Sequence, residues 1–147
     1  MLTRRILAAL ALIAGLVAPV HAQAIGGGPG FGGVIANVNI TSTSASIPNT
    51  SLINLTPASP AMQQYTVSVY LGCTVPGTGN NQTQIQYTDD TGSQNALVTA
   101  NQPCGSSANF ISNVFTFRAA ASTAIQYSTT YVGTGTWALS ITAERMF

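Results

Sequence analysis

The sequence has very few charged side chains, and this scarcity excludes whole classes of partner. Its 147 residues include four arginines, no lysine, three acidic residues and one histidine. Arg4, Arg5 and His21 lie in a segment that we expect to be removed on export. The remainder has two positive charges, Arg118 and Arg145, against three negative ones, a net charge of −1. Without a basic surface to neutralise phosphates, neither nucleic acid nor an anionic membrane is expected as a partner.

The lack of histidine and lysine after residue 24 also restricts the chemistry. A serine nucleophile needs a nearby base, which is usually histidine or lysine. Glycoside hydrolysis needs two carboxylates on opposite sides of a cleft, whereas Asp89 and Asp90 are adjacent in the sequence. We therefore expect a protein that is not an enzyme and that needs no cofactor.

Residues 1–24 have the features of an export signal. Two arginines precede an apolar run from Ile6 to Val17, and small residues then allow cleavage after Ala22 or Ala24. The alternative, an uncleaved anchor, is less favoured because the apolar run is short for a bilayer span and glycines follow it. The sequence thus predicts a secreted, periplasmic or cell-surface protein.

A glycine-rich leader at residues 25–33 precedes the first alternating segment. Glycine loses the most backbone entropy on ordering, so this leader is predicted to be flexible. The apolar positions of the next segment alternate: Val34, Ala36, Val38 and Ile40. We interpret this segment as the first strand of the domain's own sheet. The alternative is a self-assembly strand, donated on its tether to a neighbouring copy.

Period-two alternation continues along the rest of the chain, and no segment has a helical pattern. The runs with the clearest alternation are 65–73, 82–88, 110–118, 125–131 and 137–143. Together with the weaker alternating runs, these give about eight strands. Residues 34–147 are therefore predicted to form an all-β, antiparallel β-sandwich of the jelly-roll kind. The Gly133-Thr134-Gly135 segment between the last two runs predicts a tight hairpin.

The strand sequences at residues 65–71, 115–118, 124–131 and 137–144 resemble a pattern found in small uncharacterised β-sandwich proteins of bacteria and phages. The order and spacing of these strands are also similar to those of the trimeric jelly rolls of the C1q and tumour-necrosis-factor type. The resemblance covers roughly the last 85 residues and implies a trimer at the level of fold alone. It identifies no functional residues.

Cys73 and Cys104 are the two cysteines of an exported chain, so we predict a disulfide between them. Such a cross-link would stabilise the fold by roughly 3 to 4 kcal/mol through the entropy of the unfolded chain. The alternative is a pair of thiols, but two sulfurs without histidine leave too few ligands for zinc.

Three other groups are candidate sites. Tyr70 and Tyr131 are candidates for stacking on a ligand, because flat rings bind the apolar faces of sugars. Asp89 and Asp90 are predicted to cap a turn, with a weak calcium site as the alternative. Arg118 is expected to pair with a carboxylate or to lie over an aromatic ring.

Three classes of function fit this sequence. We favour a non-enzymatic structural subunit that associates with itself, because a neutral, hydroxyl-rich and amide-rich surface associates readily. A module that binds carbohydrate or another surface ligand is second. A small outer-membrane β-barrel is third, since Phe147 closes an alternating strand, although Arg145 would then lie on the apolar face.

Overall fold

The computed structural model describes residues 33–56, 62–107 and 109–146, in which every regular element is a β-strand. The predictions for the export signal, and for all of the leader except Gly33, lie outside these residues. The strands are β1 (Val34–Thr43), β2 (Ile47–Asn54), β3 (Met62–Val75), β4 (Gly79–Asp89), β5 (Gly92–Pro103), β6 (Phe110–Ala120), β7 (Ala124–Gly133) and β8 (Thr136–Arg145). In the described ranges there is no helix long and apolar enough to span a membrane.

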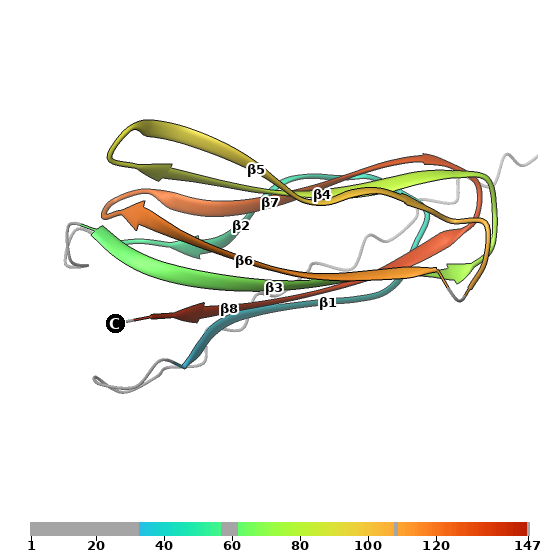
Figure 1. Ribbon diagram of the computed structural model, residues 1–147, viewed down its shortest axis with the longest axis horizontal. Helices are drawn as coiled ribbons and strands as arrows, with labels where there is room; N and C mark the ends of the chain where they lie inside the picture. The colour runs from blue at the N-terminus through green and yellow to red at the C-terminus, as the bar shows by residue number, and fades with distance from the viewer. Residues whose placement is uncertain (1–32, 57–61, 108, 147) are drawn as a thin grey trace, which may run out of the picture.

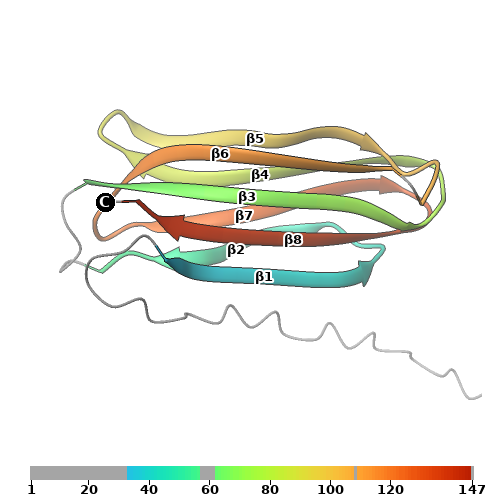
Figure 2. The ribbon, with the colours of Figure 1, turned by 60° about the horizontal axis from the view of Figure 1, so that its bottom comes forward.

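The eight strands form two antiparallel four-stranded sheets that stack face to face (Figure 1). The first sheet has the order β1-β8-β3-β6 and the second has the order β2-β7-β4-β5. Figure 2 shows the first sheet in front, with β1 at one edge and β6 at the other. This order is that of a jelly roll, which confirms the predicted fold class.

The two described sheets are open at both sides. The edge strands are β1 and β6 in the first sheet, and β2 and β5 in the second. An outer-membrane barrel requires one sheet that closes on itself. That alternative is therefore wrong.

The predicted hairpin between the last two strands is also wrong. Strand β7 pairs with β2 and β4 in the second sheet, whereas β8 pairs with β1 and β3 in the first. Gly133 and Gly135 do adopt the positive φ values that were expected, 140° and 98°. The turn they form carries the chain across from one sheet to the other. Of the strands in the described ranges, only β4 and β5 are consecutive in the chain and also paired, around the predicted turn at Asp89-Asp90-Thr91-Gly92.

Pro48 lies inside strand β2, although proline usually interrupts a strand. The strand runs through it, and the register with β7 shifts between Ile47 and Thr50. An edge strand tolerates proline because one side of its backbone has no ladder partner.

The core lies between the sheets and is built from the alternate residues that the sequence pattern selected. Trp137 is 1% exposed, and Tyr65 and Tyr127 are buried with it. The other large apolar side chains that are almost completely buried are Leu71, Ile85, Ile125, Leu139, Ile141, Val38, Val67 and Val69. These positions place Trp137 in the core and leave the intervening residues of each strand on the outer faces.

Candidate functional site

The outer face of the first sheet carries an exposed aromatic pair, Tyr70 on β3 and Phe110 on β6. Their ring centroids are 5.7 Å apart and the ring planes are inclined by 24°, so the rings are nearly parallel. Tyr70 is 45% exposed and Phe110 is 61% exposed, which is unusual for side chains of this size. We refer to these two residues as the aromatic platform.

Gly72 explains how the platform forms. It lies two residues after Tyr70 on the same face of β3 and pairs with Phe110 on β6. A Cβ atom on Gly72 would lie 3.3 Å from both Cε1 and Oη of Tyr70, and 3.5 Å from Cβ of Phe110. The glycine therefore leaves the space in which the tyrosine ring lies over the backbone of the sheet.

Small uncharged side chains surround the platform. Tyr70 pairs with Ser112 on one side and with Ser140 on the other, and Ser140 pairs with Asn39 on β1. In antiparallel strands, paired residues project from the same face of the sheet. The platform is thus flanked by a row of hydroxyl and amide groups that offers hydrogen bonds without charge.

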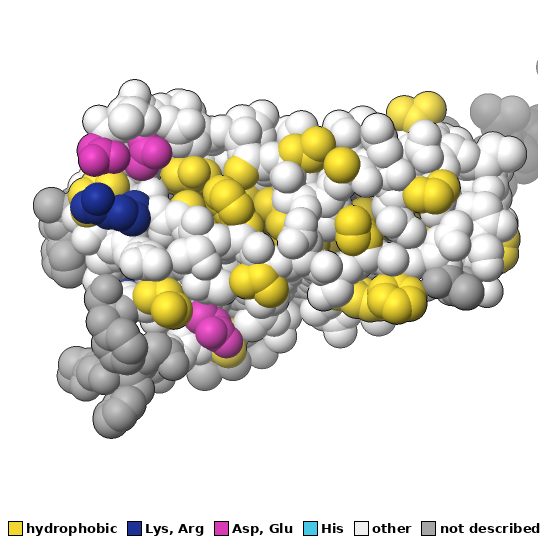
Figure 3. Space-filling view, viewed as in Figure 1, with side chains coloured by type: hydrophobic (Ala, Val, Ile, Leu, Met, Phe, Trp, Pro, Cys, Tyr) yellow, Lys and Arg dark blue, Asp and Glu magenta, His cyan; other side chains and the backbone are white. Residues whose placement is uncertain are grey.

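The charged side chains of the described residues lie at the opposite end of the sandwich. They are Asp89, Asp90, Arg118, Glu144 and Arg145. This is the end at which β3 begins and β4, β6 and β8 end (Figure 1). On the face seen in Figure 3, the acidic and basic side chains gather there. Phe110 and Arg118 are eight residues apart on β6, a separation of about 27 Å.

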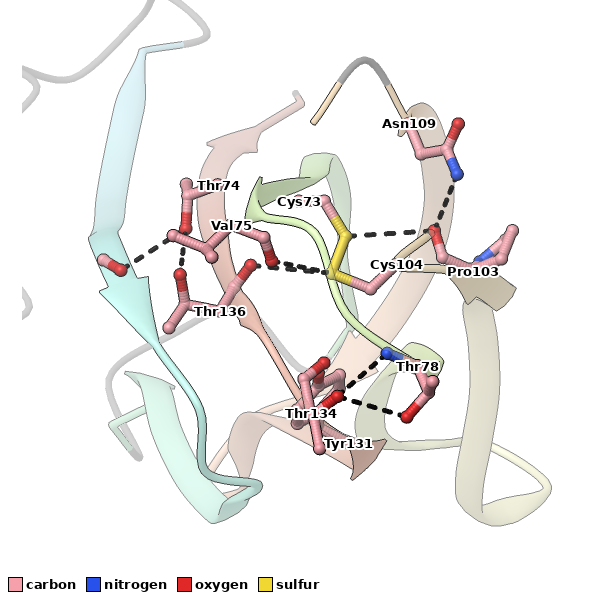
Figure 4. The surroundings of a disulfide bond; sticks show 11 residues. Cys73, Thr74, Val75, Thr78, Pro103, Cys104, Asn109, Tyr131, Thr134 and Thr136 are labelled. Carbon is pink, nitrogen blue, oxygen red and sulfur yellow. Dashed lines mark hydrogen bonds between the residues drawn. A yellow bond between two sulfur atoms is a disulfide. The ribbon is translucent and has the colours of Figure 1, made fainter. Parts of the chain in front are cut away.

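The disulfide fixes the segment that leads into the platform (Figure 4). Cys73 and Cys104 are bonded as predicted, with their Cα atoms 5.4 Å apart. The N–H of Cys73 donates to the carbonyl of Asn109, the residue before Phe110, at 3.0 Å. The Asn109 side chain donates in turn to the carbonyl of Pro103 at 3.2 Å. Cross-linking therefore holds the start of β6 against the end of β3.

Tyr131 does not belong to this surface, although it was a candidate for ligand stacking. It is buried against Trp137 with ring centroids 6.4 Å apart, and its hydroxyl donates to the carbonyl of Thr134. Phe110 takes its place in the candidate site, and the sequence analysis missed that role. The sequence pattern could have indicated it, because Phe110 alternates with Ile111 and shares its outward face with the polar Ser112.

Asp89 holds the β4–β5 turn together. Its Oδ1 accepts hydrogen bonds from the N–H of Thr91 at 2.8 Å and from the Thr91 hydroxyl at 2.7 Å. These contacts, with the hydroxyl contributing most, hold the pKa of the Asp89 carboxyl below its usual range. In the described part of the chain, no three His, Cys, Asp or Glu side chains are grouped closely enough to hold a metal ion. The geometry is that of the predicted turn cap.

The candidate self-assembly strand lies in the first sheet of its own chain. In β1, Ala36 pairs with Ala143 and Val38 with Ile141 of β8, and Ala36 and Val38 are buried. Val34 and Ile40 are paired with β8 as well and are partly buried. This is the arrangement expected for the first strand of a self-contained domain.

No protein-family model matches this sequence, and no curated protein does. Among solved structures, the chain is similar to the CBM22-1 and GH10 modules of an endo-1,4-beta-D-xylanase from Clostridium thermocellum, complexed with xylohexaose. The two share 15% sequence identity with a TM-score of 0.42, over 77% of this chain and 22% of that one. The chain thus spans less than a quarter of the xylanase, and a likeness at this level says nothing about function.

Proposed function

We propose that the protein is an exported, non-enzymatic module that binds a neutral polyhydroxylated ligand, such as a glycan, on the aromatic platform. The exposure of Tyr70 and Phe110 as a nearly parallel pair is the observation that carries this proposal. Sugar rings present apolar C–H faces that stack on aromatic rings, while their hydroxyls seek hydrogen-bond partners. The platform offers the rings, and the neighbouring serines and Asn39 offer the partners.

The absence of charge around the platform selects among glycans. An acidic polysaccharide would need cations nearby, but the two arginines of the described residues lie toward the other end of the sandwich. A neutral glycan needs no counter-charge, and its binding depends little on salt. We therefore place neutral glycans before acidic ones.

The test is binding of the exported chain to a panel of neutral and acidic polysaccharides, measured by affinity electrophoresis and by calorimetry with soluble fragments. Tyr70→Ala and Phe110→Ala are each expected to weaken binding at least about tenfold, because each removes a stacking surface. Leu97→Ala is the matched control, since Leu97 is 51% exposed on the second sheet. The proposal fails if no neutral glycan is retained, or if the platform variants bind as well as the control.

Self-association, the function favoured from the sequence, stands as a second proposal. It is supported by the scarcity of surface charge, because only five of the described residues are charged. Such a surface offers little electrostatic repulsion between copies. Since β1 pairs with β8 of its own chain, the contact does not require this strand to be donated to a neighbouring copy.

A further inference from the structure

We propose that two copies of the chain pair antiparallel through strand β6, so that Arg118 of each copy covers Phe110 of the other. The two first sheets then form one continuous eight-stranded sheet. The proposal does not depend on ligand binding at the platform. It rests on three properties of the β6 edge: it has no bulge or proline, its backbone has free hydrogen-bonding groups, and its side chains match those of a second copy.

Of the four edge strands, β6 has the least protection. Strands β1 and β2 each have two register shifts, and β2 also contains Pro48. Strand β5 has two shifts, a positive φ at Asn101 and ends at Pro103. By contrast, β6 pairs with β3 without a shift over its whole length, from Phe110↔Gly72 to Ala120↔Met62. Bulges, prolines and charges are the means by which proteins blunt sheet edges, and β6 has only Arg118.

The backbone of β6 presents unused groups at this edge. The N–H of Val114 donates to Oδ1 of its neighbour Asn113 at 3.0 Å, so it points away from β3. Alternate residues of an antiparallel strand share this direction, and Ser112 and Thr116 therefore present their N–H and C=O groups at the same edge. The Asn113 side chain is a local cap, which also donates to the carbonyl of Val98 at 2.7 Å. A backbone partner would replace that cap.

One register matches the side chains of two such edges. When Val114 lies opposite Val114 of the second copy, Phe110 lies opposite Arg118, and Ser112 lies opposite Thr116. All of these side chains are on the outer face, where Phe110 and Val114 are each 61% exposed. A guanidinium over an aromatic ring is a favourable contact, and a serine opposite a threonine forms a hydrogen bond.

The charges also favour this register. Among the described residues of its own chain, Arg118 makes no hydrogen bond and no ion pair. In the pair, each Arg118 lies four residues from Val114, so the two guanidinium groups are about 27 Å apart and do not repel. If the centre moves to Asn113, Arg118 falls opposite residue 108, outside the strand, and its contact with Phe110 is lost.

The partner of the β6 edge is a second copy of the chain, because the edge is complementary to itself. A two-fold axis relates the two copies, so each makes the same contacts with the other and the assembly closes at a dimer. This differs from the trimer implied by the C1q-type resemblance. It also places the two aromatic platforms on one continuous face. In the dimer an arginine of the other copy lies over Phe110, so Tyr70 is the ring left open, and the preference for neutral glycans argued above applies to the monomer.

The test is sedimentation velocity of the exported chain, without ligand, at concentrations up to about 100 µM. The expected result is a reversible dimer. Val114→Lys is expected to abolish it, because two ammonium groups would meet at the two-fold axis. Val132→Lys is the matched control, since Val132 is 70% exposed on β7 and lies outside the proposed contact. A monomer throughout, a trimer or filament, or equal loss in both variants would overturn the proposal.

A double-mutant cycle tests the register and remains informative if Val114→Lys does not fold. Arg118→Ala and Phe110→Ala are each expected to weaken dimerisation about tenfold, because each removes both symmetric contacts. Together they should cost little more than either alone. Asn113→Ala should strengthen the dimer by freeing the Val114 N–H. Additive effects of the first two variants would contradict the register even if a dimer forms.

Discussion

Gly79 and Gly133 face each other across β4 and β7, and neither position has room for a side chain. Their φ values are 111° and 140°. A Cβ atom on Gly79 would lie 1.8 Å from the carbonyl oxygen of Val132, and one on Gly133 would lie 1.9 Å from that of Thr78. The two glycines thus allow the backbones to approach at the corner where β7 leaves for the opposite sheet.

Replacing either glycine should therefore be costly. Gly79→Ala and Gly133→Ala are each expected to lower the free energy of unfolding by more than about 2 kcal/mol, from strained backbone and displaced neighbours. Gly105→Ala is the control, because nothing lies within 4 Å of a Cβ there and its φ is not positive. Urea denaturation measures all three. Equal stability of Gly79→Ala and Gly105→Ala would contradict this account of the corner.

The sequence was sufficient to predict the strands and their buried faces. Alternation is a local property, so the runs 65–73, 82–88 and 137–143 were recognised as strands, and Tyr65, Ile85 and Trp137 within them are buried. Pairing is not local. The glycines at the end of β7 and just after it were read correctly as sites of positive φ. Their pattern does not say whether the next strand returns beside β7 or crosses to the other sheet. Sandwich topology, rather than turn chemistry, decides that point.

The candidate site was predicted only in part, for a similar reason. Tyr70 was named as a stacking candidate from its chemistry, and in the structure it faces away from its buried neighbours on β3. Its partner Phe110 lies 40 residues later, and only the β3–β6 register brings the two together. Tyr131 has the same chemistry as Tyr70, and only its inward direction, shared with Ile125 and Tyr127, separates the two tyrosines.

Two paired threonines in the core should respond in opposite ways to the same substitution. The hydroxyl of Thr99 accepts the N–H of Thr83 at 2.8 Å, whereas the hydroxyl of Thr83 is buried without a partner. Thr99→Val should therefore lower the free energy of unfolding by about 1 to 3 kcal/mol, because it leaves a buried donor unsatisfied. Thr83→Val should be neutral or stabilising. Thermal unfolding of both variants measures the difference, and a loss of stability in Thr83→Val would indicate a hidden partner, such as a bound water.

Reduction of the disulfide should weaken the fold and the platform together. The cross-link spans a sequence separation of 31 residues, and its loss should lower the free energy of unfolding by about 3 to 4 kcal/mol. Urea denaturation with and without reductant measures this difference in the free energy of unfolding. The double variant Cys73→Ala/Cys104→Ala provides an independent check. Because Cys73 also holds Asn109, the Tyr70–Phe110 pair should become more mobile in the reduced protein. Unchanged stability after reduction would show that the cross-link does not constrain the unfolded chain.

Stability should depend little on pH near neutrality and should fall in alkali. Apart from the disulfide cysteines, the described residues contain no group that normally titrates between about pH 5 and 9, since they lack histidine and lysine. Burial raises the pKa of Tyr65 and Tyr127 above the ordinary value of 10.0, against an opposing effect of Arg145 at Tyr65 and of the Thr50 hydroxyl at Tyr127. A raised folded-state pKa means that the unfolded chain loses these protons first. The contribution of these tyrosines to stability is therefore complete below about pH 10 and is lost as the pH rises through the folded-state pKa values.

Tyr127→Phe isolates one of these groups. Among the described residues, the buried Tyr127 hydroxyl makes no hydrogen bond of ordinary geometry, although the Thr50 hydroxyl is near enough to lower its pKa, so its removal should change the neutral-pH stability little. Above pH 10 the variant should lose less stability than the wild type, by up to about 1.4 kcal/mol per pH unit for the one proton removed. Urea midpoints measured from pH 6 to 11 give both curves. Parallel curves would mean that Tyr127 ionises equally in both states, and that its burial does not control the alkaline limit of the fold.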